Sequence, residues 1–182
     1  GEEQKVTVTA ANLESLMGPR RVKPDFYNRS NAVGIANGLA WTSVGGAILP
    51  IEVQTIPGGT GKFELTGSLG DVMKESAKIA VSYLRANAAR FGIPADFHKS
   101  YDLHIHFPEG ATPEDGPSAG VTITTALVSA LTGIPVRSDV AMTGEVSLRG
   151  RVLAIGGLRE KTMAAFRAGM KTVIIPADNE KD

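Results

Sequence analysis

A serine and a lysine stand out as residues that could together attack a carbonyl carbon. Ser118 lies in a Gly-Pro-Ser-Ala-Gly segment, residues 116–120, and Lys161 follows 43 residues later. A serine hydroxyl becomes a strong nucleophile when a neighbouring base removes its proton, and a neutral lysine amine can be that base. The pair therefore indicates nucleophilic catalysis, provided that the fold brings the two side chains together.

Ser118 stands at the predicted start of a helix over residues 117–132, which Gly133 ends. Pro117 suits the first turn, because its missing N–H would have no partner within the helix. A helix N-terminus carries unpaired N–H groups and partial positive charge, which would stabilise an oxyanion forming near the serine. The alternative is that Ser118 only caps the helix, a common role for serine there.

Lys161 is expected on the apolar side of a second helix, over residues 157–168. On a helical wheel its neighbours are Leu158, Ala164, Ala165 and Ala168, whereas the opposite arc carries Arg159, Glu160, Met163 and Arg167. A lysine among alanines either extends its amine to solvent or is partly desolvated. Desolvation would lower its pKa and make the amine a competent base. The sequence alone leaves both alternatives open.

Two other catalytic or binding patterns fit poorly. The G-x-S-x-G match around Ser118 occurs in α/β-hydrolases, but their histidine follows the serine and none follows it here. His104 or His106 could act as the base from upstream, although paired histidines on the outer face of a strand are more often structural. The glycine-rich residues 57–62 lack the first glycine and the final Ser or Thr of a phosphate-binding loop, so we expect a turn there.

The composition excludes several further chemistries. Nineteen basic and nineteen acidic residues balance, which gives no electrostatic reason to expect nucleic acid or an acidic membrane as partner. The chain has no cysteine and only three histidines, which excludes disulfides and thiolate metal sites. No apolar run is long enough to span a bilayer. We therefore expect no cofactor, no metal, no nucleic-acid site and no membrane contact in this domain.

The 182 residues are expected to form a single domain, spanning residues 1–182. The clearest helix begins at Asp71 and runs to about Phe91, where Gly92 and Pro94 end it. A helical turn is predicted at residues 12–16 and a loop at 17–31. Strands are predicted over residues 6–9, 33–41, 46–56, 62–66, 101–107, 140–143, 151–155 and 172–175. This mixture indicates an α+β domain, with a two-layer arrangement of packed helices on a mixed sheet.

Several segments together resemble one family, the Lon proteases of the A-type, in which an ATPase is fused to the peptidase. Residues 113–120 resemble the nucleophile motif of that family, and residues 156–161 resemble its lysine motif. Residues 142–150 look like the signature that connects the two, and residues 38–42 and 67–70 match as well. The resemblance covers nearly the whole chain from about Val33 to Asp182.

The resemblance implies the Lon proteolytic-domain fold and a catalytic dyad of Ser118 and Lys161 that needs no histidine. It also implies that Thr143 forms a hydrogen bond with the lysine amine and that Asp115 lies near the site. The matched motifs add two supporting candidates, Ala119 and Trp41.

The resemblance also implies a wider biology. Lon proteases are homo-hexamers that degrade unfolded, damaged or regulatory polypeptides, with ATP and Mg²⁺ bound in an ATPase module that precedes the peptidase. We expect this chain to be the proteolytic domain without that module, from a bacterial cytoplasm or a mitochondrial matrix. Two other classes stay open: a Lon-like domain that has lost catalysis and only supports an oligomer, and a hydrolase of small amides or esters. Retention of both Ser118 and Lys161 argues against the first.

Overall fold

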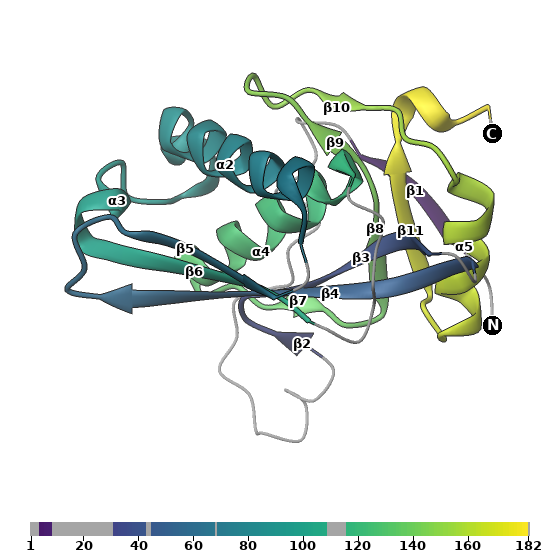
Figure 1. Cartoon of the computed structure of the whole chain (residues 1–182), viewed down its shortest axis with the longest axis horizontal. Helices are drawn as coiled ribbons and strands as arrows, with labels where there is room; N and C mark the ends of the chain where they lie inside the picture. The colour runs from purple at the N-terminus through teal and green to yellow at the C-terminus, as the bar shows by residue number, and fades with distance from the viewer. Residues whose placement is uncertain (1–3, 9–30, 43–44, 68, 109–115, 182) are drawn as a thin grey trace.

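The computed structural model describes residues 4–8, 31–42, 45–67, 69–108 and 116–181. Its strands, in chain order, are β1 (Gln4–Val8), β2 (Asn31–Ala32), β3 (Ile35–Thr42), β4 (Gly45–Pro57), β5 (Phe63–Gly67), β6 (Tyr101–Phe107), β7 (Val136–Arg137), β8 (Val140–Met142), β9 (Glu145–Val146), β10 (Val152–Leu153) and β11 (Thr172–Pro176). In this part of the chain, seven strands form one sheet in the order β1-β11-β8-β3-β4-β6-β5 (Figure 1). The short strands pair separately, β2 with β7 and β9 with β10.

Nearly all strands of the large sheet run in one direction. β1, β11, β8 and β3 are parallel neighbours, and β5 is parallel to β6. Only β4, among the described strands of this sheet, runs the other way, because it is antiparallel to both β3 and β6. The carboxyl ends of the remaining strands therefore lie along one edge. In open sheets of this kind, ligand-binding side chains gather beyond that edge.

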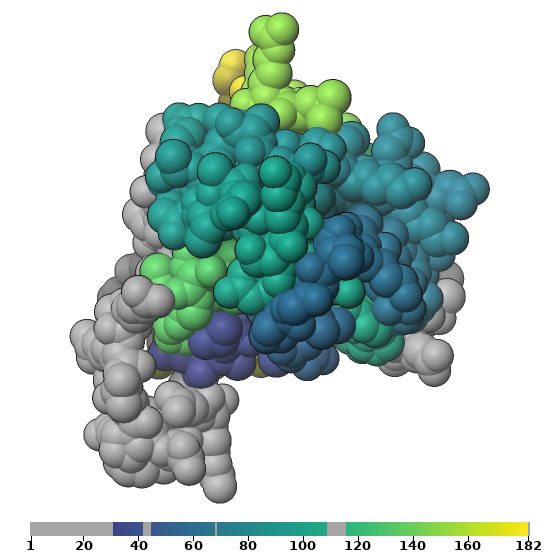
Figure 2. Space-filling view, turned by 90° about the vertical axis from the view of Figure 1, so that its left-hand side faces the viewer, coloured from purple at the N-terminus to yellow at the C-terminus, as the bar shows by residue number. Residues whose placement is uncertain are grey.

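The longer helices are α2 (Asp71–Ala86), α4 (Gly120–Thr132) and α5 (Leu158–Arg167), and the shorter ones are η3 (Ala88–Phe91), α3 (Phe97–Ser100), η4 (Pro117–Ala119) and η5 (Ala177–Asn179). Figure 1 shows α2 and α4 above the sheet, and Figure 2 shows the α2–α3 region (teal) stacked above the turn between β4 and β5 (blue). None of the described helices is long and apolar enough to cross a membrane.

Helices pack on both faces of the sheet, as the alternating side chains of β3 show. Ala36 and Ala40 belong to the core beneath α2 and α4, whereas Leu39 belongs to a second cluster with Leu158 and Ala165 of α5. Successive side chains of a strand point to opposite faces, so α5 covers the face opposite α4. The prediction of an α+β domain with helices packed on a mixed sheet is confirmed. The structure adds that one of these helices, α5, lies on the second face.

The long elements follow the sequence closely. The helix predicted from Asp71 is α2 followed by η3, and Gly92, with φ 68°, ends it. The helices predicted at residues 117–132 and 157–168 are η4 with α4, and α5. The structure adds α3, β7 and β9, which were not predicted. The helical turn expected at residues 12–16 and the loop at residues 17–30 lie outside the described residues, and Asn31 lies in β2.

Gly46 in β4 allows α5 to approach the sheet closely. A Cβ atom at Gly46 would lie 2.5 Å from the carbonyl oxygen of Glu160 and 3.0 Å from Cβ of Ala164. Because the first of these is a backbone atom, the whole helix would have to move to accommodate a side chain. Glu160 directly precedes Lys161, so this close approach also determines where the lysine lies.

We expect Gly46→Ala to lower the free energy of unfolding by about 1–3 kcal/mol, the usual cost of overpacking a close contact. Guanidinium unfolding followed by circular dichroism measures the change. Gly156→Ala is the matched control, because a Cβ there would meet no heavy atom within 4 Å and its φ is not left-handed. Equal stability of Gly46→Ala and the parent would show that α5 does not depend on this approach.

Candidate active site

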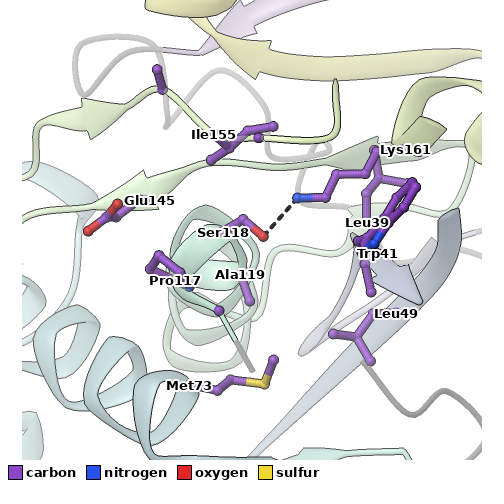
Figure 3. Close-up of a pocket in the computed structure, with 14 residues that line it drawn as sticks. Leu39, Trp41, Leu49, Met73, Pro117, Ser118, Ala119, Glu145, Ile155 and Lys161 are labelled. Atoms are coloured by element: carbon purple, nitrogen blue, oxygen red, sulfur yellow. Dashed lines mark hydrogen bonds between the residues drawn. The ribbon is translucent and has the colours of Figure 1, made fainter. Parts of the chain in front are cut away.

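Ser118 and Lys161 line the same pocket, at the edge of the sheet where the parallel strands end. The pocket has a volume of about 260 Å³. It is lined by segments from most parts of the chain: Leu39, Ala40 and Trp41 of β3, Leu49 of β4, Met73 of α2, Gly116–Ala119, Glu145 of β9, Ala154–Gly156 and Lys161 of α5. Figure 3 shows Ser118 near the middle of this set, with Lys161 directed toward it.

Backbone contacts hold Ser118 at the start of a helix. Pro117 occupies the first turn of η4, which continues directly into α4. The carbonyl oxygen of Ser118 accepts a hydrogen bond from Gly144 N–H at 2.9 Å, and the carbonyl oxygen of Gly144 accepts one from Val121 N–H at 3.0 Å. Gly144 lies two residues beyond β8, so these bonds fasten the helix start to the end of that strand. The positive end of the helical stretch thus faces the pocket.

Lys161 is buried, with only 4% of its surface exposed. Its Nζ donates a hydrogen bond to Ser118 Oγ at 3.0 Å. Burial lowers the pKa of Lys161 below its ordinary 10.5, because the ammonium form loses its hydration. No carboxylate among the described residues lies within ion-pair distance of Nζ to oppose this shift. Of the two alternatives for this side chain, the structure therefore has the desolvated one.

The pair comes from helices on opposite faces of the sheet. Ser118 leads into α4, and Lys161 belongs to α5, which packs on the other face through Leu158 and Ala165. Leu39 and Trp41 at the end of β3 line the pocket with them. The serine and the lysine therefore meet beside the last residues of β3 and beyond the end of β8, whose last residue, Met142, pairs with Gly38.

Of the supporting residues expected from the sequence, some line the pocket, one does not, and one lies outside the described residues. Ala119 and Trp41 both line the pocket. Thr143 is fully buried directly after β8, and its N–H donates to the carbonyl oxygen of Ile174 at 3.1 Å. Its Oγ1 has no hydrogen-bond partner among the described residues, so the bond expected with the lysine amine is not formed in this structure. Asp115 lies outside the described residues.

His104 and His106 lie on the outer face of β6, away from the buried side of that strand. Each ring makes a 2.8 Å hydrogen bond with Thr66 Oγ1, and His104 Nδ1 lies 4.0 Å from a carboxylate oxygen of Glu64. Neither histidine lines the pocket that holds Ser118. The arrangement corresponds to the structural reading of the two histidines and gives the serine no histidine base.

The chain is similar to one family of proteases along nearly its whole length. Residues 7–182 match the family described as the Lon protease (S16) C-terminal proteolytic domain. The chain belongs to this family. It is 58% identical to the Lon protease of Brevibacillus choshinensis over 182 residues, which is 100% of this chain and 23% of that protein. It is 59% identical to Lon protease 1 of Thermus thermophilus over 172 residues, 94% of this chain and 22% of that protein. The chain thus spans less than a quarter of the length of these relatives.

The Lon proteolytic domain is a serine peptidase domain, so the resemblance read from the motifs is confirmed at the level of the family. The name of a third relative, the Lon protease of Nitratidesulfovibrio vulgaris, agrees; it is 54% identical over 181 residues, 100% of this chain and 22% of that protein. Peptide-bond hydrolysis is therefore the chemistry against which the site must be judged.

The glycine-rich turn at residues 57–62 does not fit a nucleotide phosphate. Asp102 Oδ1 accepts hydrogen bonds from the N–H groups of Thr60 and Lys62, at 3.0 and 2.7 Å. In a phosphate-binding loop such N–H groups would face the ligand, and a helix would follow, whereas β5 follows here. Within the described residues, no three side chains of His, Asp or Glu lie close enough to hold a metal ion.

Several pocket residues were not identified from the sequence. Met73, Glu145 and Ile155 line the pocket, yet they lie in three separate segments of the chain and carry no recognisable local signal. Glu145 falls within residues 142–150, a segment whose likeness to the family was noted without any role for this carboxylate. Only the fold places these side chains beside Ser118.

We expect Lys161→Met to raise the thermal midpoint at neutral pH, because methionine is apolar and pays no cost for a buried charge. Lys161 is protonated in the unfolded chain below pH 10.5, while the folded state binds its proton less tightly. The loss of stability that Lys161 causes in the parent is therefore complete below the pKa of the folded state and disappears as the pH rises toward 10.5. The difference in thermal midpoint between Lys161→Met and the parent should become smaller over the same pH range.

Thermal unfolding at several pH values measures this difference. Lys78→Met is the matched control, since Lys78 is an exposed helical lysine of α2 and its replacement should change the midpoint little. A Lys161→Met protein less stable than the parent at pH 7 would mean that the hydrogen bond to Ser118 outweighs the cost of burial.

Proposed function

We propose that this proteolytic domain cuts peptide bonds with Ser118 as nucleophile and Lys161 as general base. The observation that carries the proposal is the 3.0 Å contact between a buried lysine amine and a serine hydroxyl at the start of a helix. A desolvated amine holds its proton weakly, and the hydroxyl lies within the distance at which a proton can pass to it. No histidine is needed for this reaction.

The reaction would proceed through an acyl-enzyme. As Ser118 Oγ bonds to the substrate carbonyl carbon, its proton passes to the neutral Lys161 amine, and the carbonyl oxygen becomes an oxyanion. The positive end of the helical stretch over residues 117–132 stabilises that oxyanion. The Lys161 ammonium then gives its proton to the departing amine as the C–N bond breaks. A water molecule, deprotonated by the same amine, hydrolyses the acyl-serine and returns both groups to their starting states.

The residues that line the pocket favour a substrate with an apolar side chain next to the bond that is cut. Leu39, Leu49, Met73 and Ile155 contribute hydrocarbon surface, whereas Glu145 is the one carboxylate among the described residues that line the pocket. Burial of apolar substrate surface would supply binding energy, and an acidic side chain would be repelled by Glu145. Polypeptides with exposed apolar residues, such as unfolded or damaged proteins, have this chemistry.

In the complete enzyme we propose ATP-dependent degradation by a homo-hexamer, as the resemblance to A-type Lon proteases implies. The ATP and Mg²⁺ would bind in a preceding module, since the turn at residues 57–62 of this chain does not fit a phosphate. The bacterial sources of the relatives support a bacterial cytoplasm as the compartment. The domain itself would use no cofactor.

We expect Ser118→Ala to abolish cleavage of casein and of a fluorogenic peptide, because removing the nucleophile of such a site costs several orders of magnitude in rate. The thermal midpoint should change little, since the loss of a cap-like hydroxyl costs at most about 2 kcal/mol. Ser82→Ala is the control, an exposed serine of α2 whose loss should not affect the rate.

A Ser118→Ala protein that keeps more than about a hundredth of the parent rate would end the assignment of the nucleophile. Assays of small esters in parallel with the peptide distinguish a peptidase from the two other classes of protein that the sequence left open. Cleavage of esters without peptides indicates a small-molecule hydrolase, and no cleavage of either by the parent indicates an oligomerisation module.

We expect activity to rise with pH through one ionisation below 10.5 and then level off, because only the neutral Lys161 amine accepts the serine proton. Lys161→Arg should be inactive at every working pH, since a guanidinium does not lose its proton. The measurement is the pH profile of kcat/KM for the fluorogenic peptide. Replacing His104 and His106 together by glutamine should leave the profile unchanged. Substantial activity in Lys161→Arg would mean that the lysine acts as a fixed charge and not as a base.

A further inference from the structure

The buried side chain of Asn179 forms hydrogen bonds with the backbone of residues 154–157, the segment that forms one wall of the Ser118 pocket. Its Nδ2 donates a hydrogen bond to the carbonyl oxygen of Ile155 at 3.0 Å, and its Oδ1 accepts one from Ile155 N–H at 2.8 Å. Asn179 is only 2% exposed. It is the last residue of η5, which directly follows β11, so it reaches the segment from the edge where the parallel strands end.

The segment held by Asn179, residues 154–157, lies between β10 and α5 and belongs to no regular element. Two of its residues are glycines, and Gly157 has a left-handed φ of 68°. Consecutive glycines leave a chain many accessible conformations. Yet residues 154–156 line the pocket, and Figure 3 shows Ile155 and Met73 on opposite sides of Ser118. A wall of this composition needs an external support to keep one shape.

We propose that Asn179 is a positioning residue for substrate binding. The inference rests on the proposed peptidase function and deepens it. Asn179 touches no substrate; by bonding both polar groups of Ile155 it holds residues 154–157 in the shape against which a peptide lies beside Ser118. Because the wall is already ordered, the free energy of substrate binding does not include the entropic cost of ordering it.

Ser118 and Lys161 are held in place by contacts that do not involve Asn179. Lys161 stays in place through α5, which packs by Leu158 and Ala165 on the sheet, and Ser118 stays through its bond to Gly144. Loss of the Asn179 amide should therefore weaken peptide binding more than it slows the reaction of Ser118 itself. That separation distinguishes a positioning role from general support of the fold.

The test uses Asn179→Ala and measures KM and kcat for a fluorogenic peptide, together with the rate at which methanesulfonyl fluoride modifies Ser118. This reagent is small enough to need the serine and its base but not the wall. We expect KM to rise about three- to tenfold, the range that lost hydrogen bonds of ordinary strength predict. The kcat and the sulfonylation rate should stay within about twofold of the parent.

Two further variants make the test specific. Asn179→Leu has nearly the shape of asparagine but can bond neither backbone group of Ile155, so its KM should rise as far as that of Asn179→Ala, and it serves if the alanine variant fails to fold. Asn87→Ala is the matched control, because the Asn87 amide also bonds a backbone carbonyl, that of Tyr83 at 2.9 Å, but does not line the pocket. Its KM should equal that of the parent.

An unchanged KM in folded Asn179→Ala overturns the inference, and so does a parallel loss of kcat and sulfonylation. Hydrogen exchange gives a readout that does not depend on activity: amides of residues 154–157 should exchange faster in Asn179→Ala than in the parent, with the rest of the chain unchanged. If the parent cleaves no peptide, the proposed function fails. Peptide binding to Ser118→Ala with and without Asn179→Ala, followed by fluorescence anisotropy, then decides the role of Asn179 separately.

Discussion

The site depends on keeping one lysine amine out of water and 3.0 Å from a serine hydroxyl. A solvated lysine near neutral pH is almost entirely an ammonium ion and cannot accept a proton. Burial of Lys161 raises the free energy of the charged form and lowers its pKa. This condition requires apolar neighbours and a helix that packs on the sheet without a gap. The alanines and Leu158 of α5 meet the first requirement, and the close approach at Gly46 meets the second.

The direction of the strands explains why residues far apart in the sequence share the pocket. β3 ends beside Trp41, β8 ends just before Thr143, and β11 leads through η5 to Asn179. Because these strands are parallel neighbours, their carboxyl ends lie together. An antiparallel arrangement would have sent alternate ends to opposite edges of the sheet. The topology thus gathers the lining of the pocket before any side chain contributes its chemistry.

How much could be predicted from the sequence depended on whether the signal was local. Ser118 and Lys161 could be named as candidates because a proline-initiated helix and an alanine-rich helix face are read within a few residues, and the resemblance to the Lon motifs then implied that they form a dyad. Asn179 and Met73 carry no such signal, since their roles arise from contacts with segments distant in the chain. The same reason accounts for β7 and β9, which are two residues long and exist only through their pairing with β2 and β10. The expected bond of Thr143 depended on side-chain orientation, which no motif encodes.

Burial of the Lys161 amine and formation of the oxyanion would act on the lysine proton one after the other. Lys161 Nζ contacts Ser118 Oγ at the start of a helical stretch, and burial disfavours the ammonium while no substrate is bound. In the proposed reaction, the oxyanion that forms when Ser118 attacks would place a negative charge close to the amine and favour the ammonium that has just formed. The proton would then remain on Lys161 for the lifetime of the intermediate, where the departing amine can take it. No carboxylate of the described residues lies within ion-pair distance of Nζ; one placed there would favour the ammonium in the resting state and oppose the proposed role of the amine as a base.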